Sequence, residues 1–495
     1  MYLGIDCGTQ GTKVIVLDTE QACILGEGYS PHSLITDEHG RREQEPGWWI
    51  EAFINSYHDA LKSSEVDSRL IKGIGVSGQQ HGLVTLNKTG QVIRPAKLWC
   101  DTETEPQNIE ILHKLGGIAG SLDSLGLVIT TGYTISKLLW LKQNEPESFQ
   151  KIAHILLPHD YFNYWLTGEL VTEYGDASGT GYFDVRSRQW SPEMLELIGC
   201  KHLVSALPTL LPAEQPVGLV KKDIANLLRL NSNVVVASGG GDNMMGAIGT
   251  GNIHEGIVTM SLGTSGAVYA NSSLPLKPNP LIAPFCSSTN EWLPLICTMN
   301  VTSALNVVRE LFDLTITDFN VTASQAQIGC SGITMLPFLN GERVPDLPDA
   351  KGSILGLNAH NMTTANLCRA VMEGATFGLR YGLDLLCATG IQSSEIRLIG
   401  GGSKSQLWRQ MVANVMNTRI VCPDVGEAAA LGAAIQAVWC DSRCHGNPVE
   451  LTQLCDRYVR LDPSRTTLPE PQASAAYQSA YTQYKERLSL IHTIN

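Results

Sequence analysis

The chain has 495 residues, which is too long for one hydrophobic core and favours two large α/β domains. Its formal net charge of −13 argues against nucleic acid or an anionic membrane as a partner. The sequence carries no pattern typical of a signal peptide and no apolar run long enough to cross a bilayer, and its 13 cysteines include no CxxC pair. We therefore expect reduced cysteines and a cytoplasmic protein.

The first predicted element is a hairpin. Residues 2–5 and 13–18 are predicted strands, and the glycine-containing turn Asp6–Thr12 joins them. Consecutive backbone N–H groups in such a turn can bind an anion, although ordinary β-hairpin turns also favour glycine.

The next segments alternate helix and strand. Apolar residues at helical spacing predict a helix over 46–63, and residues 70–89 are predicted as strand, turn and strand. The turn contains Gln80, His81 and Gly82, which suit hydrogen bonding to hydroxyl groups. A lone histidine is nevertheless more often a structural residue.

The most informative stretch begins at Gly239. The β-branched run 234–236 predicts a buried strand that leads through three glycines to Asp242 and Asn243. Open α/β folds bind ligands at this end of their strands. A carboxylate there can accept a proton from a substrate hydroxyl, as kinases require. The alternative is a tight turn with an acidic residue at the start of a helix.

A second predicted hairpin follows, with strands over 257–262 and 267–270. Its turn, Gly263–Gly266, repeats the Gly-Thr-x-Gly pattern that begins at Gly8, 255 positions earlier. A repeat at half the chain length predicts a duplicated domain. We place the two domains at residues 1–232 and 233–495.

The remainder of the second half is predicted to be more helical. A linker-like segment covers 462–471, and a terminal helix carries Tyr477, Tyr481 and Tyr484, which we expect to pack in the interior. The other predicted elements are a loop over 272–284 and helices over 302–314, 364–389 and 403–417.

These segments together resemble the FGGY carbohydrate kinases, and within that family the members that phosphorylate xylulose. The similarity runs through almost the whole chain. It departs from the family pattern at Gln80, where Met is common, and at Asn414, where Asp is usual. The segments that carry it are GIDCGTQGTKV (4–14), SGQQHGLV (77–84), LWCDTET (98–104), GYTISKLLWLKQN (132–144), SLGTSG (261–266), GSILGL (352–357), NLCRAVMEG (366–374) and GGGSKSQLWRQMVAN (400–414).

The resemblance implies an α/β fold of the actin/hexokinase type, with two ribonuclease-H-like domains around a central cleft. It implies ATP-dependent phosphorylation of D-xylulose, with ATP and Mg²⁺ between the domains and the sugar mostly on the first. A kinase for another ketose or polyol, such as D-ribulose, is the alternative, and a non-catalytic actin-like nucleotide switch is a more distant one. Family analogy also allows a homodimer.

The resemblance also assigns residues by position. Asp242 corresponds to the catalytic aspartate and Asn243 to its sugar-contacting neighbour, while Asp6 corresponds to the acid that holds Mg²⁺. Gln80, His81 and Gly82 fall on the sugar site. The residues that fall on the phosphate and nucleotide loops are Thr9, Gln10, Gly11, Lys13, Gly263, Thr264, Gly400, Gly401, Gly402 and Ser405.

Overall fold

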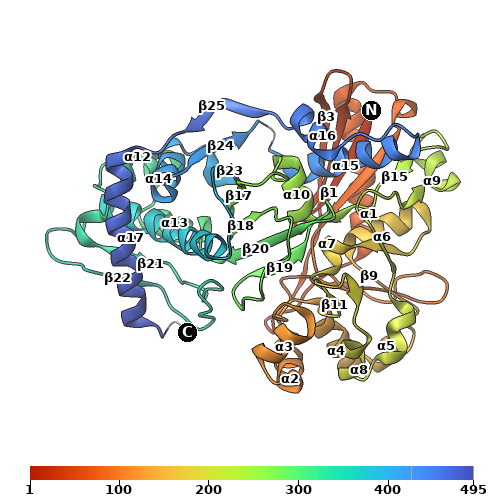
Figure 1. The fold of residues 1–495 in the computed structure, drawn as a ribbon, viewed down its shortest axis with the longest axis horizontal. Helices are drawn as coiled ribbons and strands as arrows, with labels where there is room; N and C mark the ends of the chain where they lie inside the picture. The colour runs from red at the N-terminus through yellow and green to blue at the C-terminus, as the bar shows by residue number, and fades with distance from the viewer. Residues whose placement is uncertain (425, 494–495) are drawn as a thin grey trace.

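Two large β-sheets organise the chain, and helices pack on and between them (Figure 1). The structure is a computed structural model that describes residues 1–424 and 426–493. The first sheet has the order β14-β15-β6-β1-β2-β3, and β16 also pairs with β6. Its strands are β1 Tyr2–Cys7, β2 Gly11–Asp18, β3 Cys23–Pro31, β6 Gly73–Gly78, β14 Gly218–Leu219, β15 Val235–Val236 and β16 Gly240–Gly241.

The second sheet repeats the topology of the first. Each has a three-stranded antiparallel unit (β1-β2-β3 and β17-β18-β20), then two parallel strands and an antiparallel strand beyond them. The duplication predicted from the two hairpins is therefore confirmed. The strands of the second sheet are β17 Ile257–Leu262, β18 Gly266–Ala270, β19 Ala283–Cys286, β20 Trp292–Thr298, β23 Glu395–Ile399, β24 Arg419–Pro423 and β25 Leu461–Thr467.

Short strands form small sheets outside these two: β4 Ile35–Thr36 with β5 Arg42–Gln44 and β8 Ala96–Lys97, β7 Val84–Leu86 with β9 His154–Leu156, β10 Val171–Glu173 with β13 Thr209–Leu211, β11 Phe183–Asp184 with β12 Gln189–Trp190, and β21 Thr334–Leu336 with β22 Ser353–Leu355.

Helices fill the connections in both halves. In the first half they are α1 Pro46–Ser64, α2 Glu105–Leu115, α3 Ile118–Leu125, α4 Thr134–Asn144, α5 Pro146–Phe149, α6 Pro158–Thr167, α7 Tyr174–Ala177, α8 Pro192–Leu197 and α9 Lys222–Leu227. In the second half they are α10 Asp242–Thr250, α11 Thr302–Leu311, α12 Ile316–Ser324, α13 Thr364–Ala388, α14 Gln406–Met416, α15 Ala428–Cys444, α16 Leu451–Tyr458 and α17 Pro471–Ile491. No helix among the described residues is long and apolar enough to cross a membrane.

Most predicted elements are present, with differences at their ends. The segment at 462–471 was wrong as a linker, because β25 pairs with β24 and extends the second sheet. Helix α11 ends at Leu311 rather than at 314, and α14 begins at Gln406 after a short 3₁₀ turn. The tyrosines of α17 pack against Phe377, as expected, and all 13 cysteines are free.

Helix α15 ties the second half of the chain to the first sheet. A Cβ added to Gly4 would lie 1.9 Å from the carbonyl oxygen of Ala430, and one added to Gly75 would lie 1.9 Å from that of Ala433. Glycines on β1 and β6 therefore let this alanine-rich helix lie directly on the sheet. As a result, the N-terminal end of α15 lies close to the C-terminal end of β1, which leads into the first glycine turn.

The division near residue 233 stays a prediction, because the strands next to it connect the halves. Strands β15 and β16 follow residue 233 in sequence, yet both pair with β6 of the first sheet. A division drawn from strand pairing alone would fall between β16 and β17.

Candidate active site

Asp242 lies at the start of α10, directly after β16, which pairs with the last residues of β6. The side chain of Gln436 in α15 holds the preceding turn, since its Oε1 accepts the N–H of Gly239 at 2.8 Å. A Cβ added to Gly241 would lie 2.8 Å from the side chain of Gln80, so glycine lets the Gln80 amide lie directly against this turn. The carboxylate is thus placed by rigid elements from both halves.

A hydrogen-bonded group joins Asp242 to the turn after β6. Asn243 donates from its backbone N–H at 2.8 Å and from Nδ2 at 3.1 Å to Oδ1 of Asp242. The same Nδ2 donates to Oε1 of Gln80 at 3.0 Å. Three residues predicted for the sugar and catalytic sites therefore meet, although two of them are 163 positions apart in sequence.

Two acids of this region, Asp242 and Asp6, have raised pKa values. Burial raises the pKa of Asp242 to about 7, and the nearby Asp6 and Asp176 carboxylates add to the shift. Burial also raises the pKa of Asp6, while Ser77, whose hydroxyl donates to Asp6 Oδ1 at 2.9 Å, lowers it. A carboxylate with a pKa near neutrality can accept a proton from a hydroxyl and release it again.

His81 presents its imidazole between elements from both halves. The residue has φ of 63°, and its ring centroid lies 4.9 Å from that of Tyr133 and 5.8 Å from that of Phe285 on β19. Burial lowers the pKa of His81 to about 3, with help from the Lys137 and Arg343 cations. The ring is therefore neutral near pH 7. Its Nδ1 is buried against Gly179, which leaves Nε2 as the ring nitrogen available to a hydroxyl.

The first glycine hairpin is held by side chains that the sequence did not single out. Trp99 donates from Nε1 to the Thr9 hydroxyl at 2.9 Å, and this hydroxyl donates to Oε1 of Gln79 at 3.0 Å. Lys13 forms an ion pair with Glu427, just before α15. Thus the Thr9 hydroxyl and the Lys13 ammonium group are both already engaged within the protein.

The second hairpin lies against the glycine turn at 400–402. A Cβ added to Gly400, which has φ of 86°, would lie 2.7 Å from the backbone of Leu262, directly before Gly263. Thr264 is exposed at the tip of the hairpin. Ser405 instead caps α14 and donates to Asn320 Oδ1 at 2.7 Å, which gives its hydroxyl a structural partner.

The predicted site residues therefore form two groups. Asp6, Gln80, Asp242 and Asn243 gather at the end of the first sheet with the first hairpin, whereas 263–264 and 400–402 form a second cluster. Their roles in binding stay predictions. Gln79 and Glu427 were missed because their contacts join distant segments, and only the resemblance could have pointed to them.

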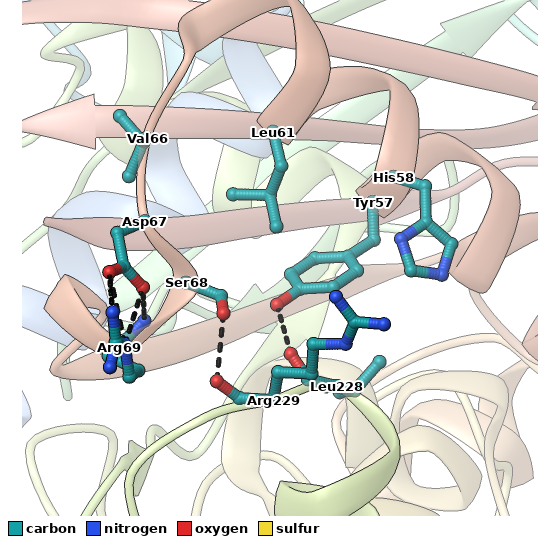
Figure 2. Close-up of a pocket in the computed structure, with 9 residues that line it drawn as sticks. All are labelled: Tyr57, His58, Leu61, Val66, Asp67, Ser68, Arg69, Leu228 and Arg229. Carbon is teal, nitrogen blue, oxygen red and sulfur yellow. Dashed lines mark hydrogen bonds and ion pairs between the residues drawn. The ribbon is translucent and has the colours of Figure 1, made fainter.

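Two other features of the described residues, a surface hollow and an acidic cluster, lie outside the candidate active site. A hollow between the end of α1 and the turn at 228–229 is lined by groups that bond to one another: Tyr57 donates to the carbonyl of Leu228 at 2.6 Å, and Ser68 to that of Arg229 at 2.8 Å (Figure 2). Glu43, Asp101 and Glu103 form an acidic cluster, but Lys97 pairs with all three. It is therefore an internal ion-pair network.

Family models match most of the chain. The model described as FGGY family of carbohydrate kinases, N-terminal domain, matches residues 1–249, and the C-terminal domain model matches residues 258–440. The chain belongs to the FGGY family of carbohydrate kinases. Its activity is therefore that of an ATP-dependent carbohydrate kinase.

Individual relatives agree with this membership. A xylulose kinase of Haemophilus influenzae is 53% identical over 498 residues, which cover 99% of this chain and 100% of the relative. A solved structure described as a xyloylose kinase from Brucella ovis is 30% identical, with a TM-score of 0.92 and coverage of 100% of both chains. A gluconate kinase structure from Lactobacillus acidophilus is 25% identical, with a TM-score of 0.91 over 99% of this chain and 98% of that one. The fold is that of the actin/hexokinase-type ATPases.

Proposed function

We propose that this protein transfers the γ-phosphoryl group of ATP to the terminal hydroxyl of D-xylulose, which yields D-xylulose 5-phosphate. The observation that carries the proposal is the identity of 53% to a xylulose kinase along the whole chain. The geometry supports it, because a half-buried carboxylate lies beside a cluster of amide and imidazole groups suited to a polyhydroxylated substrate.

In this proposal Asp242 is the general base. Its raised pKa gives it an affinity for the hydroxyl proton near neutral pH, and its bonds to Asn243 fix the carboxylate against the attacking oxygen. Gln80, Asn243 and neutral His81 hold the sugar hydroxyls. Phosphoryl transfer depends mainly on such positioning and on charge stabilisation.

Asp6 is the proposed Mg²⁺-holding residue. Its carboxylate is half-buried; burial raises its pKa, the Lys13 cation lowers it and Glu427 raises it again. Because Lys13 is already paired with Glu427, Asp6 adds a net negative charge that a cation would relieve. Oxygen ligands of this kind suit Mg²⁺, which characteristically keeps several waters. When bound, the metal ion would neutralise charge on the β- and γ-phosphates. The glycine turns of both hairpins would supply backbone N–H donors to the same phosphates.

The nearest alternative is a kinase for another ketose or polyol. The gluconate kinase structure, whose TM-score nearly equals that of the Brucella protein, indicates that this fold is compatible with different sugars. Specificity then depends on side chains of the turn at 80–82, which we call the sugar turn. A substrate hydroxyl that is missing or inverted there leaves a buried polar group of the protein without its partner.

The test is a panel of substrates. We expect ADP formation to be fastest in kcat/KM with D-xylulose when D-ribulose, glycerol and gluconate are compared under the same conditions. A higher kcat/KM for any of the other three would replace D-xylulose as the substrate. ADP formation that no sugar stimulates would instead favour a nucleotide switch.

A further inference from the structure

Lys137 is a buried cation that the proposed reaction does not use. It lies on α4, within the segment 132–144 that supports the family resemblance, and its side chain is inaccessible to solvent. Its Nζ donates to the carbonyl oxygen of His81 at 2.6 Å and also to that of Gly132. The Asp101 carboxylate that acts on it is itself paired with Lys97 at 3.0 Å. The contacts of Lys137 are therefore directed at backbone carbonyls.

The carbonyl of His81 is a point where the sugar turn can be fixed. His81 adopts φ of 63°, a left-handed conformation that is unfavourable for a residue with a Cβ. Two donors converge on its oxygen, since Thr134 Oγ1 also donates to it at 3.1 Å. Both donors come from the first turn and a half of α4, so this helix stabilises the strained conformation.

The imidazole has little freedom once the backbone of His81 is set. A Cβ added to Gly179 would lie 1.9 Å from ring atoms of His81, and Tyr133 and Phe285 lie against the same ring. The backbone N–H of Ile135 donates to Thr180 O at 2.8 Å, which attaches the start of α4 to this neighbouring segment. A shift of the His81 backbone would therefore move the ring relative to a substrate held beside Asp242.

We propose that Lys137 is a positioning residue for sugar binding, which acts by holding the left-handed backbone of His81 through that residue's carbonyl. The inference rests on the proposed function, because it assumes that His81 contacts the sugar. Burial lowers the pKa of Lys137 to about 7, but a neutral amine still has an N–H for each carbonyl. The two contacts are thus maintained in either protonation state.

The test compares two lysines on one helix. Lys142 donates to the carbonyls of Ile198 and Gly199 at 2.8 and 3.0 Å, the same kind of contact away from the sugar turn. We expect Lys137→Met to raise both the KM and the calorimetric Kd for D-xylulose by about 10- to 100-fold, the scale on which small displacements of a binding group act. The KM for ATP should change less than about two-fold, and Lys142→Met should leave the sugar constants unchanged.

A double mutant separates positioning from general destabilisation. If Lys137 acts through His81, Lys137→Met should add little to the sugar KM of His81→Ala, because the group being positioned is already absent. If Lys137→Met does not fold, Thr134→Val removes the other donor to the His81 carbonyl and should raise the sugar KM in the same direction.

Several outcomes would overturn the role of Lys137. These are a folded Lys137→Met with wild-type sugar Kd, a parallel rise in the KM values for sugar and ATP, or full additivity with His81→Ala. When Thr134→Val is the variant in use, an unchanged sugar KM has the same meaning. Wild-type protein that acts on a different sugar would count against the proposed function, and the comparison would then use that sugar.

Discussion

Replacement of Asp242 by asparagine should abolish most activity and at the same time stabilise the protein near neutral pH. The amide is nearly isosteric but cannot take the hydroxyl proton. Positioned proton transfer contributes about 10²–10⁴ in rate, so kcat should fall by that factor. Stability should rise because wild-type protein must keep a carboxyl half-buried near two other acids.

The pH dependence of that gain follows from the pKa of the carboxyl, which folding raises from 3.8 to about 7. Below 3.8 both states are protonated and the group has no effect. Between these values the unfolded chain loses its proton while the folded protein retains it, so wild-type stability falls as pH rises, and above about 7 the penalty is constant. A difference of about three between the unfolded and folded pKa values lowers the free energy of unfolding by at most about 4 kcal/mol. Because the carboxyl is partly exposed, we expect Asp242→Asn to gain about 1–3 kcal/mol.

The assay is differential scanning calorimetry of both proteins at pH 5 and pH 8, together with single-turnover measurement of phosphoryl transfer. The melting temperature of Asp242→Asn should exceed that of wild type by more at pH 8 than at pH 5. Asp67→Asn is the matched control, because Asp67 is exposed and Arg69 lowers its pKa to about 2, so this variant should gain no stability.

Each of two results would refute one part of this reasoning. Near wild-type kcat in Asp242→Asn, with chemistry shown to be rate-limiting, would remove the general-base role. An equal or smaller stability gain at pH 8 than at pH 5 would contradict the raised pKa that follows from burial.

Three further expectations concern the same site. His81→Ala should raise the KM for D-xylulose and leave that for ATP nearly unchanged, as steady-state kinetics can measure; equal rises in both would count against a sugar-specific contact. Asp6→Asn should lose rate that added Mg²⁺ partly restores, whereas Asp242→Asn should not respond to the metal; a Mg²⁺ titration with the same response in both variants would reject the distinction. Saturation with sugar and a non-hydrolysable ATP analogue should reduce the radius of gyration, because closure would exclude water from phosphoryl transfer; unchanged small-angle scattering would argue against closure.

The sequence alone determined the local elements and their duplication. Helical spacing of apolar residues predicted α1, and the two glycine turns predicted both hairpins, because these features depend on residues close in sequence. The stretch from Gly239 to Asn243 likewise predicted a carboxylate at the end of a strand. The segment at 462–471 was misjudged because an edge strand with few apolar residues resembles a linker until its partner strand is known.

Tertiary structure alone decided which side chains meet. The pairing of Lys13 with Glu427, the bond of Asn243 to Gln80 and the contact of Lys137 with His81 join residues separated by between 56 and 414 positions. No local pattern encodes such contacts, since they depend on how α10 and α15 pack on the first sheet and on how α4 lies against the turn after β6. The raised pKa of Asp242 has the same origin, because desolvation and neighbouring charges act only after distant acids have been brought together.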